Sequence, residues 1–285
     1  MALRINHNFQ ADFTHANLLK TEGNMNKSLE RLATGMRINR AADDAAGMFI
    51  ADQLKTYAVS LEQGTRNAQD GVSIAQIAQG ALSEVYNILN DVKAKAIQAS
   101  NTSDSTSRGQ IQQDINKLID SISKIFEDTE FNGQNLFSAT GSTTFTIHYG
   151  GRTDQELTIT SATAGASAGT STTSPSTVTI GGTLYTIDVT SQTLANDTVS
   201  TVDALIKAVD DMAAQFGSAQ IELEKIISNN ETTRVNTSEA ESRIRNVDFA
   251  KEMSNFTRNQ ILMQSGTAML AQANQLPQLV LQLLR

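Results

Sequence analysis

One long apolar stripe constrains the fold of this chain more than any other sequence feature. From Leu54 to Ala96, positions spaced alternately four and three residues apart are mostly apolar, and no proline occurs between them. This spacing is typical of a coiled coil. A helix over residues 45 to 99 would be roughly 80 Å long at 1.5 Å per residue. No small globular domain can bury such a stripe, so the sequence predicts partner helices beside it.

Four further segments have the spacing expected of those partners. The residues NTSDSTS at 101–107 predict a loop that caps the third helix, and Ser200–Asp203 has the pattern of a capping box before the fourth. The seams of the four segments are Met25, Leu29, Leu32 and Met36; Ile111, Ile115, Leu118, Ile122 and Ile125; Val202, Ile206, Val209, Ala213, Phe216, Gln220, Leu223 and Ile227; and Leu262, Gly266, Met269, Ala273, Leu276, Val280 and Leu283.

Between the helical halves the period of the apolar residues changes to two. Phe145, Ile147 and Tyr149 alternate before a Gly-Gly turn, which predicts a β-hairpin, and a second hairpin fits residues 178–189. Residues 161–177 contain only Ser, Thr, Ala, Gly and Pro, so we expect a surface loop or linker. The predicted fold class is mainly α, with long coiled-coil helices and a small β-hairpin tip.

Composition narrows the possible functions. The net charge of -8 argues against nucleic-acid binding, and the absence of cysteine removes disulfides and thiolate chemistry. The three histidines, His7, His15 and His148, form no metal-ligand or catalytic pattern, so we expect no cofactor and no enzymatic activity. Residues 259–284 carry no Asp, Glu, Lys or Arg, but eight amide side chains interrupt them, which argues against a membrane span.

Both ends of the chain resemble the bacterial flagellins. The N-terminal match is SLERLATGMRINRAADDAAGM at 28–48, followed by NAQDGVSIAQIAQGAL at 67–82 and FNGQNLF at 131–137. The C-terminal match runs from ESRIRNVDFAKEM at 241 to the final QANQLPQLVLQLLR. The resemblance implies that long antiparallel coiled-coil helices form a hairpin-shaped subunit with a small β-hairpin tip. It also implies five regions: inner-tube helices at 1–44 and 246–285, shell helices at 45–160 and 201–245, and a short variable insert at 161–200.

The resemblance also implies a function. The chain is expected to polymerise with its own copies into a secreted, extracellular flagellar filament after type III export. Expected partners are an export chaperone and the hook-junction and filament-cap proteins. Two alternatives remain open: a hook–filament junction protein, which shares the N-terminal pattern, and a helical surface adhesin that uses the Ser/Thr-rich tip.

Several residues are candidates for assembly. The predicted polymerisation seam comprises Leu29, Leu32, Met36, Leu262, Met269, Leu276, Val280 and Leu283. The resemblance implies a central channel inside the inner tube. We expect an uncharged face of the last helix to line this channel with Gln260, Gln264, Asn274, Gln278 and Gln282. A charge cluster lies between tube and shell, where the residues are either solvated or form ion pairs between subunits: Arg31, Arg37, Arg40, Asp43 and Asp44.

One segment bears on recognition by animal hosts. Strongly stimulatory flagellins engage a Toll-like receptor through a motif that resembles LQRVRELAVQ. The matching segment here is LNDVKAKAIQ at 89–98, in which Asp91 replaces an Arg and Lys95 replaces an apolar Leu. The resemblance implies that this chain evades the receptor.

Overall fold

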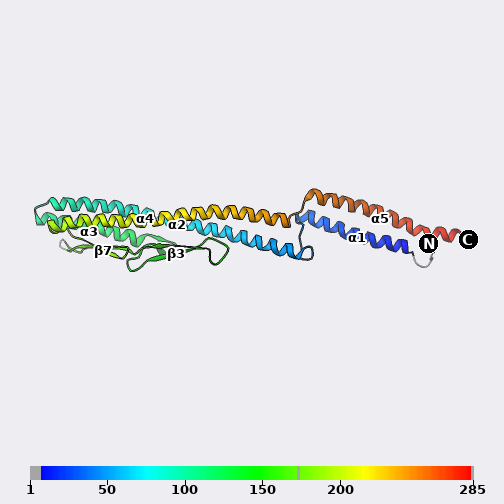
Figure 1. Cartoon of the computed structure of the whole chain (residues 1–285), viewed down its shortest axis with the longest axis horizontal. Helices are drawn as coiled ribbons and strands as arrows, with labels where there is room; N and C mark the ends of the chain where they lie inside the picture. Colours follow the sequence, from blue (N-terminus) through cyan, green and yellow to red (C-terminus); the bar gives the residue numbers. More distant parts are fainter. Residues whose placement is uncertain (1–7, 172–173, 284–285) are drawn as a thin grey trace. The chain divides into compact units, whose positions relative to one another are not determined.

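The computed structural model describes residues 8–171 and 174–283, with side chains as far as residue 275. Within these residues the chain forms long helices and small antiparallel sheets, as Figure 1 shows, which confirms the predicted mainly α class. The elements are α1 (Phe9–Thr34), α2 (Ala45–Asn101), α3 (Ser105–Asp128), β1 (Glu130–Phe131), β2 (Gln134–Asn135), β3 (Thr143–His148), β4 (Glu156–Ser161), β5 (Ala164–Ser167), β6 (Ser176–Ile180), β7 (Thr183–Ile187), α4 (Gln192–Arg245) and α5 (Phe249–Leu283).

The chain divides into two compact units. The first contains residues 1–58 and 235–285, and the second contains residues 59–234. The finer division into tube, shell and insert regions is a statement about the assembled polymer and stays a prediction.

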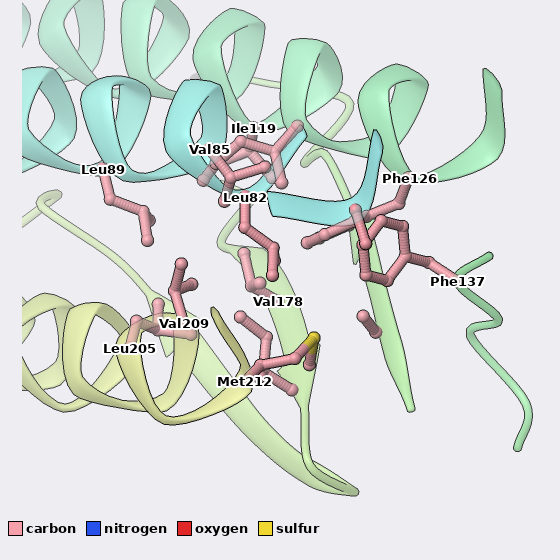
Figure 2. Close-up of a cluster of buried hydrophobic side chains, with 14 of the residues drawn as sticks. Leu82, Val85, Leu89, Ile119, Phe126, Phe137, Val178, Leu205, Val209 and Met212 are labelled. Atoms are coloured by element: carbon pink, nitrogen blue, oxygen red, sulfur yellow. The ribbon is translucent and has the colours of Figure 1, made fainter. Parts of the chain in front are cut away.

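The second unit has a continuous apolar core between helices and strands. Figure 2 shows Leu82, Val85 and Leu89 of α2 meeting side chains from α3, α4 and β6. At one end, the ring of Phe137 packs edge-on against Phe126, with centroids 5.2 Å apart. Aromatic side chains are few in this chain, and several of them are concentrated at this end of the core.

The buried stripe of α2 differs in register from the prediction at every second position. The predicted positions Ala75, Leu82, Leu89 and Ala96 are buried, but Tyr86 is 38% exposed. The alternating positions in the core are instead Ala78, Val85, Val92 and Ala99. The spacing is therefore three then four, and the predicted Gln79, Tyr86 and Lys93 lie at the edge or outside. The alanines of the buried stripe, Ala75, Ala78, Ala96 and Ala99, allow neighbouring elements to pack closely against α2.

Both predicted hairpins form. In the first, Phe145 pairs with Ile159 and Ile147 pairs with Leu157 across β3 and β4. In the second, β6 and β7 are joined by Gly181 and Gly182, whose φ angles of 63° and 78° are those that a tight hairpin turn requires.

The prediction that residues 161–177 form a loop or linker is wrong. Ala164–Ser167 forms strand β5, which pairs with β6, and the side chains of Ala164 and Ser176 are buried. Small residues let this strand approach its neighbours closely: a Cβ on Gly165 would lie 2.5 Å from the Cβ of Ala139. Strand β5 forms because of what it packs against, which the composition of this stretch does not reveal.

A buried polar network fastens α3 to this sheet. Gln112 accepts a hydrogen bond from the Val189 amide at 2.8 Å and donates one to Asn116 Oδ1 at 2.8 Å. Ser176 Oγ donates to the same Asn116 oxygen at 2.7 Å, and Asn116 donates to the Ser171 carbonyl at 3.2 Å. Leaving any of these buried groups without a partner would cost free energy, so the network fixes where the strands lie on α3.

Two helix starts test the predicted caps. Asp104 accepts hydrogen bonds from the amides of Thr106 and Ser107, which confirms the cap at the start of α3. In contrast, α4 begins at Gln192, several residues before the expected capping box at Ser200. Ser191 performs that role, since its Oγ accepts from the Leu194 amide at 3.3 Å.

Candidate assembly interface

The first unit is built on an antiparallel pair of end helices, α1 and α5. Asn8 Nδ2 donates to the Ala273 carbonyl at 2.9 Å near one end of the pair, and Arg31 Nη1 lies 3.7 Å from Glu252 Oε2 near the other. Midway, a Cβ on Gly266 would lie 3.0 Å from Leu18 Cδ1. The absence of a side chain at Gly266 therefore permits close approach of the two helices.

The inner face of this pair alternates large apolar residues with small or polar ones. On α1 it includes Ala11, Thr14, Leu18, Thr21, Met25, Ser28 and Leu32, which follow strict three-four spacing. On α5 the corresponding positions include Asn259, Met263, Gly266, Leu270 and Ala273. The leucines and methionines of this seam are only half-buried, so it gains less hydrophobic stabilisation than the core of the second unit.

The predicted seam residues lie mainly elsewhere. Leu29, Leu262 and Met269 are 54%, 49% and 60% exposed, whereas Leu32 and Met36 are half-buried. On α5 the face toward α1 is shifted by one residue, to Met263 and Leu270. The side chains of Leu276, Val280 and Leu283 lie outside the described residues. A role of the exposed residues in polymerisation stays a prediction.

Large apolar side chains are concentrated on the outward faces of the first unit. On α1, Phe9 and Phe13 are 72% and 61% exposed, and their rings stack with centroids 6.3 Å apart. Other outward apolar residues of this unit are Leu19, Phe49, Ile50, Val235, Phe249, Met253 and Ile261. An exposed apolar surface of this extent marks an interaction site.

The predicted amide face of α5 is exposed as far as the structure describes it. Gln260, Gln264 and Asn274 are all exposed, whereas the side chains of Gln278 and Gln282 lie outside the described residues. From Asn259 to Gln275 this helix carries no charged residue.

Main-chain hydrogen bonds join the ends of α1 and α4 at a joint formed by residues 35–52 and 241–252. The Val247 amide donates to the Gly35 carbonyl at 3.0 Å, and the Arg37 amide donates to the Arg245 carbonyl at 2.7 Å. Met36 and Asn246 form an isolated antiparallel bridge. Gly35 caps α1 with a φ of 71°, which a side chain would strain.

The predicted joint charges are paired within the subunit. Arg37 donates two hydrogen bonds to the Ile244 carbonyl, at 3.3 and 2.7 Å. Arg40 Nη2 lies 3.0 Å from Glu30 Oε1. Asp44 Oδ1 accepts from the Gly47 amide at 2.9 Å and so caps α2. Each of these three groups has a partner in its own chain. Ion pairing of the joint charges between subunits stays a prediction.

Asp43 is the most closely held carboxylate of the joint. Lys27 Nζ lies 2.6 Å from Asp43 Oδ1, and the amides of Asn39 and Arg40 both donate to Asp43 Oδ2 at 3.3 Å. The hydrogen bond from Lys27 lowers the pKa of this carboxyl below its usual 3.8; desolvation opposes the shift, and the two amides add to it.

Three joint residues were missed by the sequence analysis. Glu252 is 6% exposed beside Arg31, whose Nε is buried without a hydrogen-bond partner. Arg245 Nη1 lies 3.1 Å from Asp52 Oδ1. The contact of Arg245 with Glu241, four residues earlier on the same helix, is longer, at 3.9 Å. Contacts between residues so distant in sequence leave no periodic signal, although a lone acidic residue at the start of an apolar helix was a usable clue for Glu252.

The two receptor-related positions lie on α2 in the second unit. Asp91 is exposed, and Lys95 Nζ forms an ion pair with Asp114 Oδ2 of α3 at 3.0 Å. Lys95 therefore contributes to the packing of two helices in addition to any external contact.

Within the described residues, no group of histidine and carboxylate side chains could hold a metal ion. None of the described helices has an apolar stretch that could cross a membrane. Paired end helices with apolar outward faces, held by a bonded joint, define a class: structural subunits that assemble with other copies through their helical ends.

Comparison with known proteins identifies the family. The bacterial flagellin N-terminal helical region matches residues 5–142, and the bacterial flagellin C-terminal helical region matches residues 199–284. A flagellin of Halalkalibacterium halodurans is 39% identical over 99% of both chains, and one of Bacillus subtilis is 38% identical over 99% of this chain and all of its own. A flagellar filament 33 kDa core protein of Treponema phagedenis is 36% identical over 99% of both chains. The chain belongs to the bacterial flagellin family and is a structural subunit of the flagellar filament.

Proposed function

We propose that the chain leaves the cell and polymerises outside it through the outward faces of α1 and α5. The observation that carries this proposal is the exposure of large apolar side chains on both end helices, such as Phe9, Phe13 and Ile261. A secreted subunit that stayed monomeric would gain nothing from such a surface and would aggregate through it. The function is structural, with no catalytic step.

The amide face of α5 lines the central channel of the polymer. Solvated helix faces normally carry Lys and Glu, whereas Gln260, Gln264 and Asn274 are exposed on a stretch without charge. An amide lining binds neither cationic nor anionic segments of a passing chain strongly, because it presents no net charge. Gln260→Glu with Gln264→Glu is expected to slow filament growth in cells, while purified variant subunits still elongate seeds.

The proposed partners follow from assembly outside the cell. They are other copies of this chain, an export chaperone that covers the apolar end helices, and the hook-junction and filament-cap proteins at the two ends of the polymer. The exposure of Leu262 and Met269 supports an export chaperone as a partner, because such an apolar surface must be covered before export.

Elongation of filament seeds tests the proposal. Purified subunits are mixed with short filament fragments, and electron microscopy measures fragment length over time. A filament subunit lengthens the fragments steadily. A hook–filament junction protein adds once and stops, and a surface adhesin adds nothing, so either outcome would overturn the proposal.

A further inference from the structure

We propose that the stacked Phe9–Phe13 pair of one copy inserts into a strip on the outward face of α5 of a second copy, with the two copies staggered along the helix axis. This inference rests on the proposed function, because it names the two faces that meet in the polymer. The occupant of the strip is a second copy of this chain.

The inserting group is an exposed aromatic pair. Phe9 and Phe13 lie one helical turn apart on α1, and each exposes well over half of its surface. Stacked rings lose little conformational freedom on binding and bury a large apolar area, which is why aromatic residues dominate the energetics of interfaces.

The strip is a shallow depression of about 510 Å³ along α5. It is lined by Met253, Ser254, Thr257, Arg258, Ile261 and Leu262, all of them exposed. Four of these, Ser254, Thr257, Arg258 and Ile261, have the spacing i, i+3, i+4 and i+7 that forms a hole for one knob of a facing helix. The short Ser254 and Thr257 leave the depression between longer neighbours.

A second hole follows one turn along the helix. Its four residues are Arg258, Ile261, Leu262 and Ser265, which again have the spacing of a hole. Two holes one turn apart match two knobs one turn apart. In an antiparallel arrangement Phe13 enters the first hole and Phe9 enters the second.

The chemistry of the two surfaces is complementary. Arg258 borders both holes, and within the described part of the chain it has no hydrogen bond or ion pair. A guanidinium is attracted to the face of an aromatic ring, so Arg258 can stack on either phenylalanine.

A subunit cannot fill its own strip. Within one subunit Asn8 contacts Ala273 and Arg31 contacts Glu252, so Phe13 is level with residues close to 269 of α5. The first hole is centred about 12 residues away, or about 18 Å at 1.5 Å per residue. Two copies must therefore be offset by that distance. Because knob and strip are different surfaces, the contact repeats and forms an open array instead of a closed dimer.

Disulfide cross-linking tests the pairing and its stagger, since the chain contains no cysteine of its own. Ala16→Cys extends the exposed face of α1 by one turn beyond Phe13, and Ser254→Cys changes one atom in the first hole. Filaments are grown from an equal mixture of these two single variants, so every cross-link joins two copies. A disulfide needs Cβ atoms about 4 Å apart. We expect covalent dimers after oxidation of the filaments.

Ser265→Cys is the matched control. It makes the same one-atom change on the same face of α5, at the level that Ala16 would meet without a stagger. The proposal predicts no dimers from Ala16→Cys with Ser265→Cys. Dimers from this pair alone, or filaments without dimers from either pair, would overturn the stagger while the filament function stands. Failure of the unmodified chain to elongate seeds would instead overturn the proposed function.

A second experiment leaves both phenylalanines in place and fills the first hole. Thr257→Phe should raise the critical concentration for seed elongation about tenfold or more, since the knob loses its hole. Ala268→Phe adds the same ring to an exposed position on the same face, outside both holes, and should leave the critical concentration within about twofold. Equal effects of the two substitutions would contradict the proposal.

Discussion

The Val247 amide donates a hydrogen bond to the Gly35 carbonyl at 3.0 Å, at the point where α1 ends and the chain returns toward α5. Gly35 accepts this bond from a left-handed conformation, with a φ of 71°. This conformation is the reason for a glycine at the position, because the nearest atom to an added Cβ, Phe249 Cζ, is 3.7 Å away and leaves room for it.

Gly35→Ala should therefore destabilise the joint by about 1 kcal/mol through backbone strain alone. Gly23→Ala is the matched control, because Gly23 lies in the interior of α1 with no atom within 4 Å of an added Cβ. That change should stabilise the helix by about 0.5–1 kcal/mol. The rate of proteolytic cleavage near residue 35 measures both effects, and the same sign for both variants would contradict this account.

Acid should weaken the joint through Asp43. The pKa of this carboxyl is lowered in the folded chain, so its contribution is present above the unfolded value of 3.8 and is lost as the pH falls through the folded value. Hydrogen exchange of the Asn39 and Arg40 amides, which donate to Asp43, should accelerate, relative to the intrinsic rate, below about pH 4.

Asp43→Asn should remove most of this pH dependence, since an amide cannot titrate. Asp70→Asn is the control: Asp70 is exposed, and the described contacts give it no ion pair. Protection of the two amides that stays constant down to about pH 2 in the unmodified chain would show that Asp43 does not hold the joint.

Isolated subunits should lose their end helices to proteolysis. In the α1–α5 seam Thr14, Thr21 and Ser28 interrupt leucines and methionines that are only half-buried. The seam therefore buries less apolar surface than the core of the second unit, and helices of this kind open readily. Trimming should stop on the C-terminal side near residue 246 and on the N-terminal side between residues 35 and 45, where the joint bonds begin. Full resistance of the monomer to trimming would show that assembly is not needed to hold these helices. Removing residues 259–285 should leave a soluble monomer that cannot elongate seeds.

The sequence predicted those elements of the fold that depend on neighbouring residues along the chain. The helix over 45–99, the cap at Asp104 and the Gly181–Gly182 turn each depend on neighbouring residues, and all three form. The four-three spacing assigned Gln79 instead of Ala78 to the core of α2, although Ala78, Val85, Val92 and Ala99 form a wholly apolar alternative register that the sequence already offered. Periodicity could not find Lys27 as the partner of Asp43, because the contact depends on the turn between two helices.

Deleting residues 161–177 should destabilise the second unit severely. This reverses the expectation from composition, since the segment includes β5 and the first part of β6, with Ala164 and Ser176 buried. The deletion removes Ser171 and Ser176, two of the hydrogen-bond partners of the buried Asn116, at about 1–3 kcal/mol for each group left unsatisfied. Thermal unfolding should show a large fall in stability. Gly141→Ala, where the added Cβ would meet nothing within 4 Å, should have little effect. An unchanged melting temperature after the deletion would mean that the strands contribute nothing to the core.

The remaining prediction concerns recognition by an animal receptor, which the resemblance to stimulatory flagellins places on residues 89–98. Asp91 is exposed and reverses the charge expected there, and Lys95 puts an ammonium group where an apolar anchor would be buried. Loss of such an anchor typically costs about 2 kcal/mol or more of binding free energy. Purified monomer should therefore activate reporter cells weakly. Asp91→Arg with Lys95→Leu should raise the response.

The second substitution also removes the ion pair with Asp114, so the fold needs its own control. Exposed pairs contribute about 0–1 kcal/mol, and the helix packing should survive. Asp114→Asn breaks the same pair without restoring an anchor: it should leave the response as weak as before and the circular dichroism unchanged. Stimulation by the unmodified chain at the potency of a strong agonist would refute the evasion, and a rise caused by Asp114→Asn alone would mean that helix packing, and not the anchor, limits recognition.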